Sequence, residues 1–176
     1  MDPWTPRPNR ADKQASIPLL RSKPGRTFAA LCVSPEIVGA YTHFWKGRTA
    51  LCTYPECEPC HAHRAARWYG YLHVWTPATN ATALLEITPS CVTPLEEYLA
   101  QFGTLRGAKI TIARANHKIN SRVVLTAQAS AYALDKLPAT LDVRAHLRRI
   151  WETTATLAAD AAAPNDNGHA RPRLHA

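Results

Sequence analysis

The chain has 176 residues, and its 21 lysines and arginines against 13 aspartates and glutamates give a formal net charge of +8 and a pI near 9.5. Hydrophobic residues make up 46% of the chain, enough for the core of one domain, which excludes an acidic, disordered or collagen-like chain. No apolar run reaches the roughly 18 residues of a membrane-spanning helix, and no apolar signal-peptide segment precedes Arg26. We therefore expect a soluble, cytoplasmic protein whose positive charge favours a polyanionic partner.

The first predicted segment, residues 1–26, is a flexible basic arm. It contains five prolines interleaved with six basic residues, and proline disfavours both helix interiors and sheet pairing. With only two acidic residues, the arm carries a net charge of +4 of the total +8.

Four apolar or alternating segments are predicted as strands before residue 90, at residues 27–33, 36–45, 67–75 and 83–88. The second of them either is a separate strand or continues the first after a break at Pro35. Between the second and the third, residues 45–64 are rich in turn formers. In the third, alternation places Trp68, Leu72 and Val74 on a core face. Phe28 and Phe44 are also expected in the core.

A short amphipathic helix is predicted next, with Thr93 as N-cap and Glu96 completing a capping box. Its apolar positions recur at helical spacing, and Gly103 ends it. Two further strands form a hairpin at 109–114 and 122–127. An amphipathic helix at 138–159 and a disordered tail at 160–176 complete the chain.

This order of three strands, a helix and two strands matches the five-stranded OB barrel, which binds its ligand across strands 2 and 3. We therefore predict a mainly β fold. Its domain, residues 27–137, is a five-stranded OB-like barrel with a zinc-binding loop insert and one short helix between strands 3 and 4. The C-terminal helix follows this domain.

Three of the five cysteines lie within nine residues, in the spacing C-x4-C-x2-C formed by Cys52, Cys57 and Cys60. Thiolates at this spacing are typical of a zinc site, which needs a fourth ligand. The candidates nearby are His43, His61, His63 and Cys32. We favour His43, because it lies nine residues before Cys52 at the end of an extended segment, whereas His61 is bonded directly to a ligand residue. Four protein ligands leave no open position for water, which predicts a structural zinc ion.

Aromatic and basic residues are interleaved around these cysteines, as expected of a surface that stacks unpaired bases and neutralises phosphates. The second face of the 67–75 strand combines cations with rings and is predicted to be open. Residues 104–122 add five basic residues and no acidic one. The predicted nucleic-acid contacts are Trp45, Lys46, Arg48, Arg64, Arg67, Tyr69, Tyr71, His73, Trp75, Arg106, Lys109, Arg114, Lys118 and Arg122.

The segment YTHFWKGRTALCTYPECEPC places a histidine before one cysteine and then a CxxC pair, inside the first half of an OB-like strand order. Over residues 27–127 the chain thereby resembles the zinc-containing helix-destabilising single-stranded-DNA-binding proteins of tailed phages. The resemblance implies that His43, Cys52, Cys57 and Cys60 bind the zinc ion. The spacing here is shorter, and HARPRLHA ends the chain where that family has an acidic tail that recruits replication partners. Zinc-bearing OB proteins of plasmids and other mobile elements fit equally well.

These observations predict a non-enzymatic single-stranded-DNA-binding protein that serves replication, recombination or mobile-element DNA processing, with replication or recombination proteins as possible partners. An RNA-binding protein and a zinc-dependent protein-interaction module of a larger complex are the alternatives. A metal-dependent nuclease using His61, His63 or His117 with Asn116 is disfavoured, because the sequence has no carboxylate cluster for magnesium. No membrane partner is expected.

Overall fold

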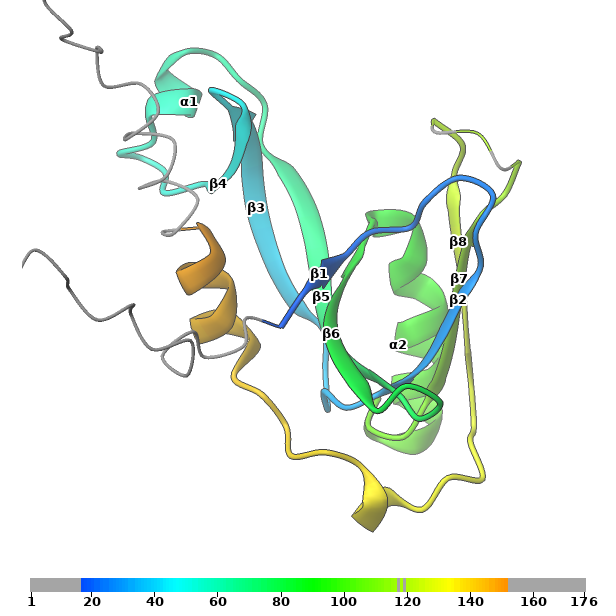
Figure 1. Ribbon diagram of the computed structural model, residues 1–176. Helices are drawn as coiled ribbons and strands as arrows, with labels where there is room; N and C mark the ends of the chain where they lie inside the picture. The colour runs from blue at the N-terminus through cyan, green and yellow to red at the C-terminus, as the bar shows by residue number, and fades with distance from the viewer. Residues whose placement is uncertain (1–16, 117, 119, 152–176) are drawn as a thin grey trace, which may run out of the picture.

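The computed structural model of the protein describes residues 17–116, 118 and 120–151 (Figure 1). This part of the chain is mainly β, with eight strands in one mixed, open sheet. The strands are β1 (Leu19–Leu20), β2 (Phe28–Cys32), β3 (Val38–Trp45), β4 (Arg48–Leu51), β5 (Arg67–Thr76), β6 (Ala81–Ile87), β7 (Lys109–Arg114) and β8 (Val123–Gln128). The helices are α1 (Glu58–His61), α2 (Val92–Phe102), the 3₁₀ helices η2 (Pro89–Cys91) and η3 (Leu134–Lys136), and a helix at 143–151. No helix of the described chain is long and apolar enough to cross a membrane.

Strand β5 is the centre of the sheet. One of its edges pairs with β6 from Gly70 to Thr76. Its other edge is shared: the first half pairs with β3, and Val74 and Trp75 pair with β2. Strands β2 and β3 therefore run along one edge of β5 as two parts of a strand interrupted near Pro35, which is one of the two alternatives that the sequence left open. The N-terminal half of β5 thereby carries the hairpin of β3 and β4.

The predicted mainly β fold is confirmed, and a helix precedes the last two strands as expected, but six strands instead of three come before that helix and the sheet does not close into the predicted barrel. Within the described chain, β6 pairs with β5 and β1, and β8 pairs with β7 alone. Residues 17–26 lie between these edges: β1 runs parallel to β6, and the Nε of Arg114 on β7 donates to the carbonyl of Ser22 at 3.0 Å. This part of the expected flexible arm is thus packed on the sheet, because Ile17, Leu19 and Leu20 contact the apolar clusters. Residues 1–16 lie outside the described range.

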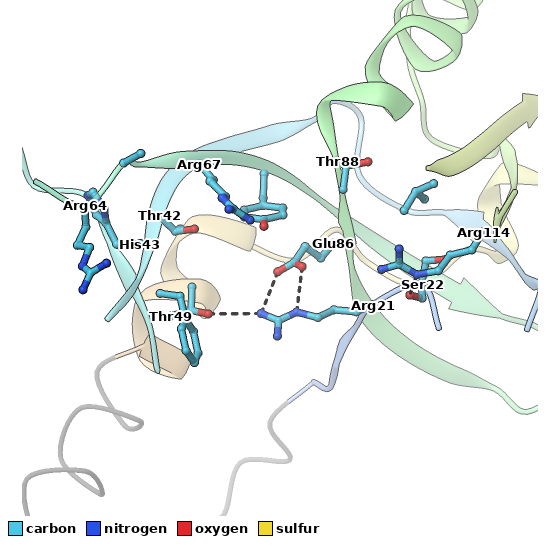
Figure 2. Close-up of a pocket in the computed structure, with 14 residues that line it drawn as sticks. Arg21, Ser22, Thr42, His43, Thr49, Arg64, Arg67, Glu86, Thr88 and Arg114 are labelled. Carbon is cyan, nitrogen blue, oxygen red and sulfur yellow. Dashed lines mark hydrogen bonds and ion pairs between the residues drawn. The ribbon is translucent and has the colours of Figure 1, made fainter. Parts of the chain in front are cut away.

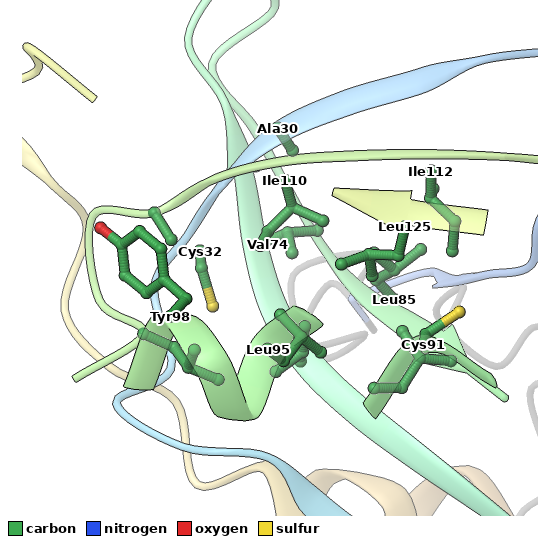
Figure 3. Packing of buried hydrophobic residues seen from close by; sticks show 14 of the residues in the cluster. Ala30, Cys32, Val74, Leu85, Cys91, Leu95, Tyr98, Ile110, Ile112 and Leu125 are labelled. Carbon is green, nitrogen blue, oxygen red and sulfur yellow. The ribbon is translucent and has the colours of Figure 1, made fainter. Parts of the chain in front are cut away.

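Helix α2 covers one face of the sheet and forms the main core there (Figure 3). Its fully buried Leu95 packs among buried residues of β5, β6 and β7, including Val74, Leu85 and Ile110. The predicted capping box is wrong, since α2 begins at Val92 with no side-chain cap: η2 leads directly into it. The predicted end is confirmed, because Gly103 adopts the left-handed conformation with a φ of 72°.

The opposite face of β5 is partly covered by the chain that follows β8. The helix at 143–151 buries Val143 and Leu147 against Tyr71, and the ring of Trp151 meets that of Tyr71 at a centroid distance of 6.0 Å. Farther along β5, Trp75 packs against the residues that follow β8. The predicted helix at 138–159 therefore starts at 143 and belongs to the packed sheet; residues 152–176 are outside the described range.

Candidate metal centre and arginine-lined groove

The metal-ligand candidates are brought together by the hairpin of β3 and β4. Its two-residue turn consists of Lys46 and Gly47, whose φ angles of 47° and 79° suit the tight turns of β-hairpins. Strand β4 thus forms within the stretch described from the sequence as rich in turn formers, where no strand was predicted. It ends at Leu51, and the N–H of the next residue, Cys52, donates to the carbonyl of Tyr41 at 2.8 Å. This pairing places Cys52 beside the buried side chain of His43.

The other two cysteines lie at the start and inside of the single-turn helix α1. Cys57 precedes α1 as its N-cap residue, and Cys60 lies within it. The Sγ of Cys60 is 3.6 Å from the Sγ of Cys52 and 3.4 Å from the Nε2 of His43. The ligand atoms of all four residues lie within 4.8 Å of one another, close enough to hold one metal ion.

The other candidates for the fourth ligand lie elsewhere. Cys32 is buried in the main core, where its Sγ donates to the carbonyl of Ser34 at 3.4 Å, and burial raises the pKa of its thiol to about 12. His61 and His63 are exposed and do not join the cluster. Of the four residues considered from the sequence, His43 is thus the one that meets the three cysteines.

The donor set fits a cation that prefers sulfur and imidazole nitrogen. Cys57 and His43 are each only 2% exposed. Burial, and then the neighbouring thiols of Cys52 and Cys57, raises the pKa of Cys60 to about 12, because an additional negative sulfur is unfavourable at this spacing. A bound cation offsets that repulsion, and three thiolates with one imidazole are a common tetrahedral set for zinc.

A groove of about 680 Å³ opens beside this centre, with His43 in its wall (Figure 2). Its described lining contains four arginines and one acidic residue. The bidentate pair of Arg21 with Glu86, at 2.9 and 3.1 Å, lies in this groove, and Arg21 also donates to the Oγ1 of Thr49 at 3.5 Å. The full lining is Arg21, Ser22, Thr42, His43, Phe44, Thr49, Arg64, Ala65, Arg67, Tyr69, Glu86, Thr88, Arg114 and Val123.

The sheet register explains how these side chains meet. Thr42 of β3 lies opposite Arg67 of β5, and Phe44 lies opposite Thr49 of β4. Residues directly opposite, and residues two apart on one strand, share a face of the sheet. Tyr69 therefore lies on this face as well. The groove lies at the Arg67 and Tyr69 end of this face of β5. The helix at 143–151 covers the other end, at Tyr71.

Four of the predicted nucleic-acid contacts gather in the groove: Arg64, Arg67, Tyr69 and Arg114. Arg48 lines a smaller hollow next to it. None of the ion pairs between described residues involves Arg64 or Arg67, so within this part of the chain no carboxylate is paired with their guanidinium groups. Arg114 instead binds backbone, since its Nη1 donates to the carbonyl of Ser121 at 2.8 Å in addition to the Ser22 contact.

Three residues of the predicted open face of β5 are buried instead, and this prediction is wrong. Tyr71, His73 and Trp75 are at most 6% exposed. The reason is the covering by the chain after β8, which packs rings on Tyr71 and Trp75. The Nδ1 of His73 accepts a hydrogen bond from the N–H of Leu141 at 3.4 Å, and burial, followed by the charges of Arg106 and His146, lowers its pKa. Only the Arg67 and Tyr69 end of the predicted face is open.

Arg106 was predicted as a phosphate contact, and its guanidinium is occupied by the protein itself. It donates to the carbonyls of Val33 at 3.1 Å, Leu137 at 3.3 Å and Pro138 at 3.0 Å, and to the Oγ1 of Thr140 at 3.2 Å. Arg106 thus holds the segment that leads to the helix at 143–151.

The remaining predicted contacts lie outside the groove. Lys46 pairs with Glu58 of α1 at 2.7 Å and lies 5.5 Å from the ring centroid of the half-buried Trp45. Lys109, Lys118 and Arg122 are exposed and do not line the groove. A role for these three in binding stays a prediction.

Several groove residues were not predicted from the sequence, among them Phe44 and Arg21. The sequence predicts Phe44 in the core, where aromatic residues of a small barrel usually lie, yet the residue is 77% exposed. Phe44 lies two residues after Thr42 on the same strand, and turn formers follow at once after Trp45. These two signals indicate a hairpin whose tip extends beyond the core. Arg21 was assigned to the arm, because nothing local in the sequence shows that Leu19 and Leu20 add a strand to β6.

Comparison with protein families, curated proteins and solved structures finds no match for this chain. Its function is therefore inferred from the chemistry of the site.

Proposed function

We propose that this protein binds single-stranded DNA in the arginine-lined groove and that a zinc ion on His43, Cys52, Cys57 and Cys60 stabilises one wall of that groove. The observation that carries the proposal is the position of the groove: it adjoins the four-ligand cluster and is lined by Arg21, Arg64, Arg67 and Arg114. A planar guanidinium matches a phosphate group in charge and in geometry.

The strand order supports a nucleic-acid ligand. The groove lies on β5 and β6, between the metal-binding hairpin and the residues at the β7–β8 end, Arg114 and Val123. OB-fold proteins bind oligonucleotides on the corresponding second and third strands, between the loops that join strands 1–2 and 4–5. We propose an OB-like ancestry of the sheet on this basis, with residues 17–26 between the two edges that a barrel would join.

A zinc ion would act here in folding and not in chemistry. Four protein ligands complete a tetrahedron and leave no position for water or a substrate. The ligand His43 is adjacent in the chain to Phe44 and Thr42 of the groove lining. Fixing the hairpin at His43 therefore fixes that wall, and we propose a binding protein without enzymatic activity.

The test is a titration of fluorescent oligo-dT at several salt concentrations, with zinc content measured on the same sample. We expect one zinc ion per chain and an affinity that falls steeply with salt. Arg64→Gln combined with Arg67→Gln should reduce the slope of log K against log salt by about 1.4, from about 0.7 per phosphate contact on a single strand.

The matched control combines Lys136→Gln with Arg144→Gln, which removes two exposed cations outside the groove. It should leave the slope nearly unchanged. An equal reduction of the salt slope in both double variants would show that binding depends on net charge and not on the arginines of the groove. Oligo-rU and a DNA duplex, titrated in parallel, test DNA against RNA and single strand against duplex; tighter binding of either would contradict the proposed ligand.

A further inference from the structure

Phe44 stands between the arginine-lined groove and a second hollow of about 300 Å³. The two hollows share Arg21, Phe44 and Thr49, so they adjoin along β3 and β4. The second hollow is lined by Leu19, Arg21, Phe44, Gly47, Arg48, Thr49, Ile150 and Trp151. Cationic side chains therefore lie on both sides of Phe44, with Arg67 in the groove and Arg48 in the second hollow.

The residues that the structure describes leave the side chain of Phe44 largely uncovered. Phe44 is 77% exposed, whereas the neighbouring residues Thr42 and His43 are each 2% exposed. Transfer of a large apolar side chain out of water is favourable. An exposed ring beside cations therefore fits a ligand that has a flat face and a negatively charged backbone. An unpaired nucleotide has both features.

The ring is also held on a rigid support. Phe44 pairs with Thr49 in the ladder of β3 and β4, and it follows the metal-ligand candidate His43 directly. A platform that is already positioned loses little conformational freedom when a base stacks on it.

We propose that Phe44 is the base-stacking platform of the site and that the bound strand passes over it from the arginine-lined groove to the second hollow. This inference rests on the proposed function and adds a path and a stacking residue to it. The strand's phosphates would meet Arg67 before the platform and Arg48 after it. Stacking on a phenyl ring discriminates little between bases, so we expect a binder with weak sequence preference.

The test compares variants of Phe44 in the zinc-loaded full chain by oligo-dT titration. Phe44→Leu retains an apolar side chain without a π-face and should weaken binding about 5- to 150-fold, the range for loss of one stacked base. Phe44→Trp should restore the affinity. The salt slope should be unchanged in both, because no charge is removed.

The matched control is Tyr54→Ala. Tyr54 follows the same hairpin, is 80% exposed, and lines neither hollow. We expect wild-type affinity from this variant, and unchanged Tm and zinc content from all three. Wild-type binding by Phe44→Leu, or an equal loss in Tyr54→Ala, overturns the stacking role while the proposed function stands. A wild-type protein that does not bind oligo-dT overturns both.

Discussion

Replacing Arg106 with glutamine should lower stability and leave nucleic-acid binding intact. The guanidinium of Arg106 donates four hydrogen bonds, three of them to carbonyls on both sides of the contact between β2 and the segment at 137–140. A hydrogen bond from a charged donor contributes about 1.5–3 kcal/mol, but bonds from one partly exposed group are not additive. We therefore expect a loss of about 3 kcal/mol in the free energy of unfolding.

Such a loss corresponds to a fall in Tm of about 6–12 °C for a chain of this size. Circular dichroism measures the Tm, and the oligo-dT titration is run on the same sample below the transition. The control is Arg144→Gln, an exposed arginine on the helix at 143–151, which should change neither quantity by much. An unchanged Tm for Arg106→Gln together with weakened binding would refute the structural role and restore the phosphate contact expected from the sequence.

Three further outcomes are expected. Cys57→Ser should lose zinc and stability together, because the binding free energy of a structural ion contributes to folding, while Cys91→Ala in the main core should retain one zinc ion by elemental analysis. Glu86→Gln should tighten oligo-dT binding about 3- to 10-fold by removing the acidic group of the groove, and Glu58→Gln, outside it, should not. Burial lowers the pKa of His73, so below about pH 6.5 the unfolded chain takes up a proton that the folded chain does not, and stability falls with decreasing pH; the Tm of His73→Gln between pH 7.5 and 5.5 should fall less than that of the wild type. Parallel pH profiles for the two proteins would contradict this.

The ligand cluster could be predicted because it is nearly local in sequence. Two residues separate Cys57 from Cys60, and a tight hairpin returns Cys52 to His43. Spacing alone therefore identified residues whose side chains meet. The strands at 67–75, 83–88, 109–114 and 122–127 also follow from local signals, alternation and turn formers, whereas β1 and β4 were not predicted.

The open and covered parts of β5 could not be predicted, because they depend on distant segments. Alternation assigned Arg67 and Tyr71 to one face correctly. Their exposure depends on the helix at 143–151, whose described residues cover Tyr71 and do not line the groove at Arg67. The same limit explains Arg106, whose acceptors lie about 30 residues later and about 70 residues earlier in the chain.

The position of β1 has a consequence for shortened forms of the protein. Leu84 of β6 donates its N–H to the carbonyl of Pro18, and β1 supplies the parallel partner of β6 at Leu19 and Leu20. A chain that starts at Thr27 would leave that row of amides and carbonyls open to solvent. Exposed strand edges recruit strands from other molecules. Self-association is therefore the expected fate of such a fragment, even though every cysteine and most of the core are still present.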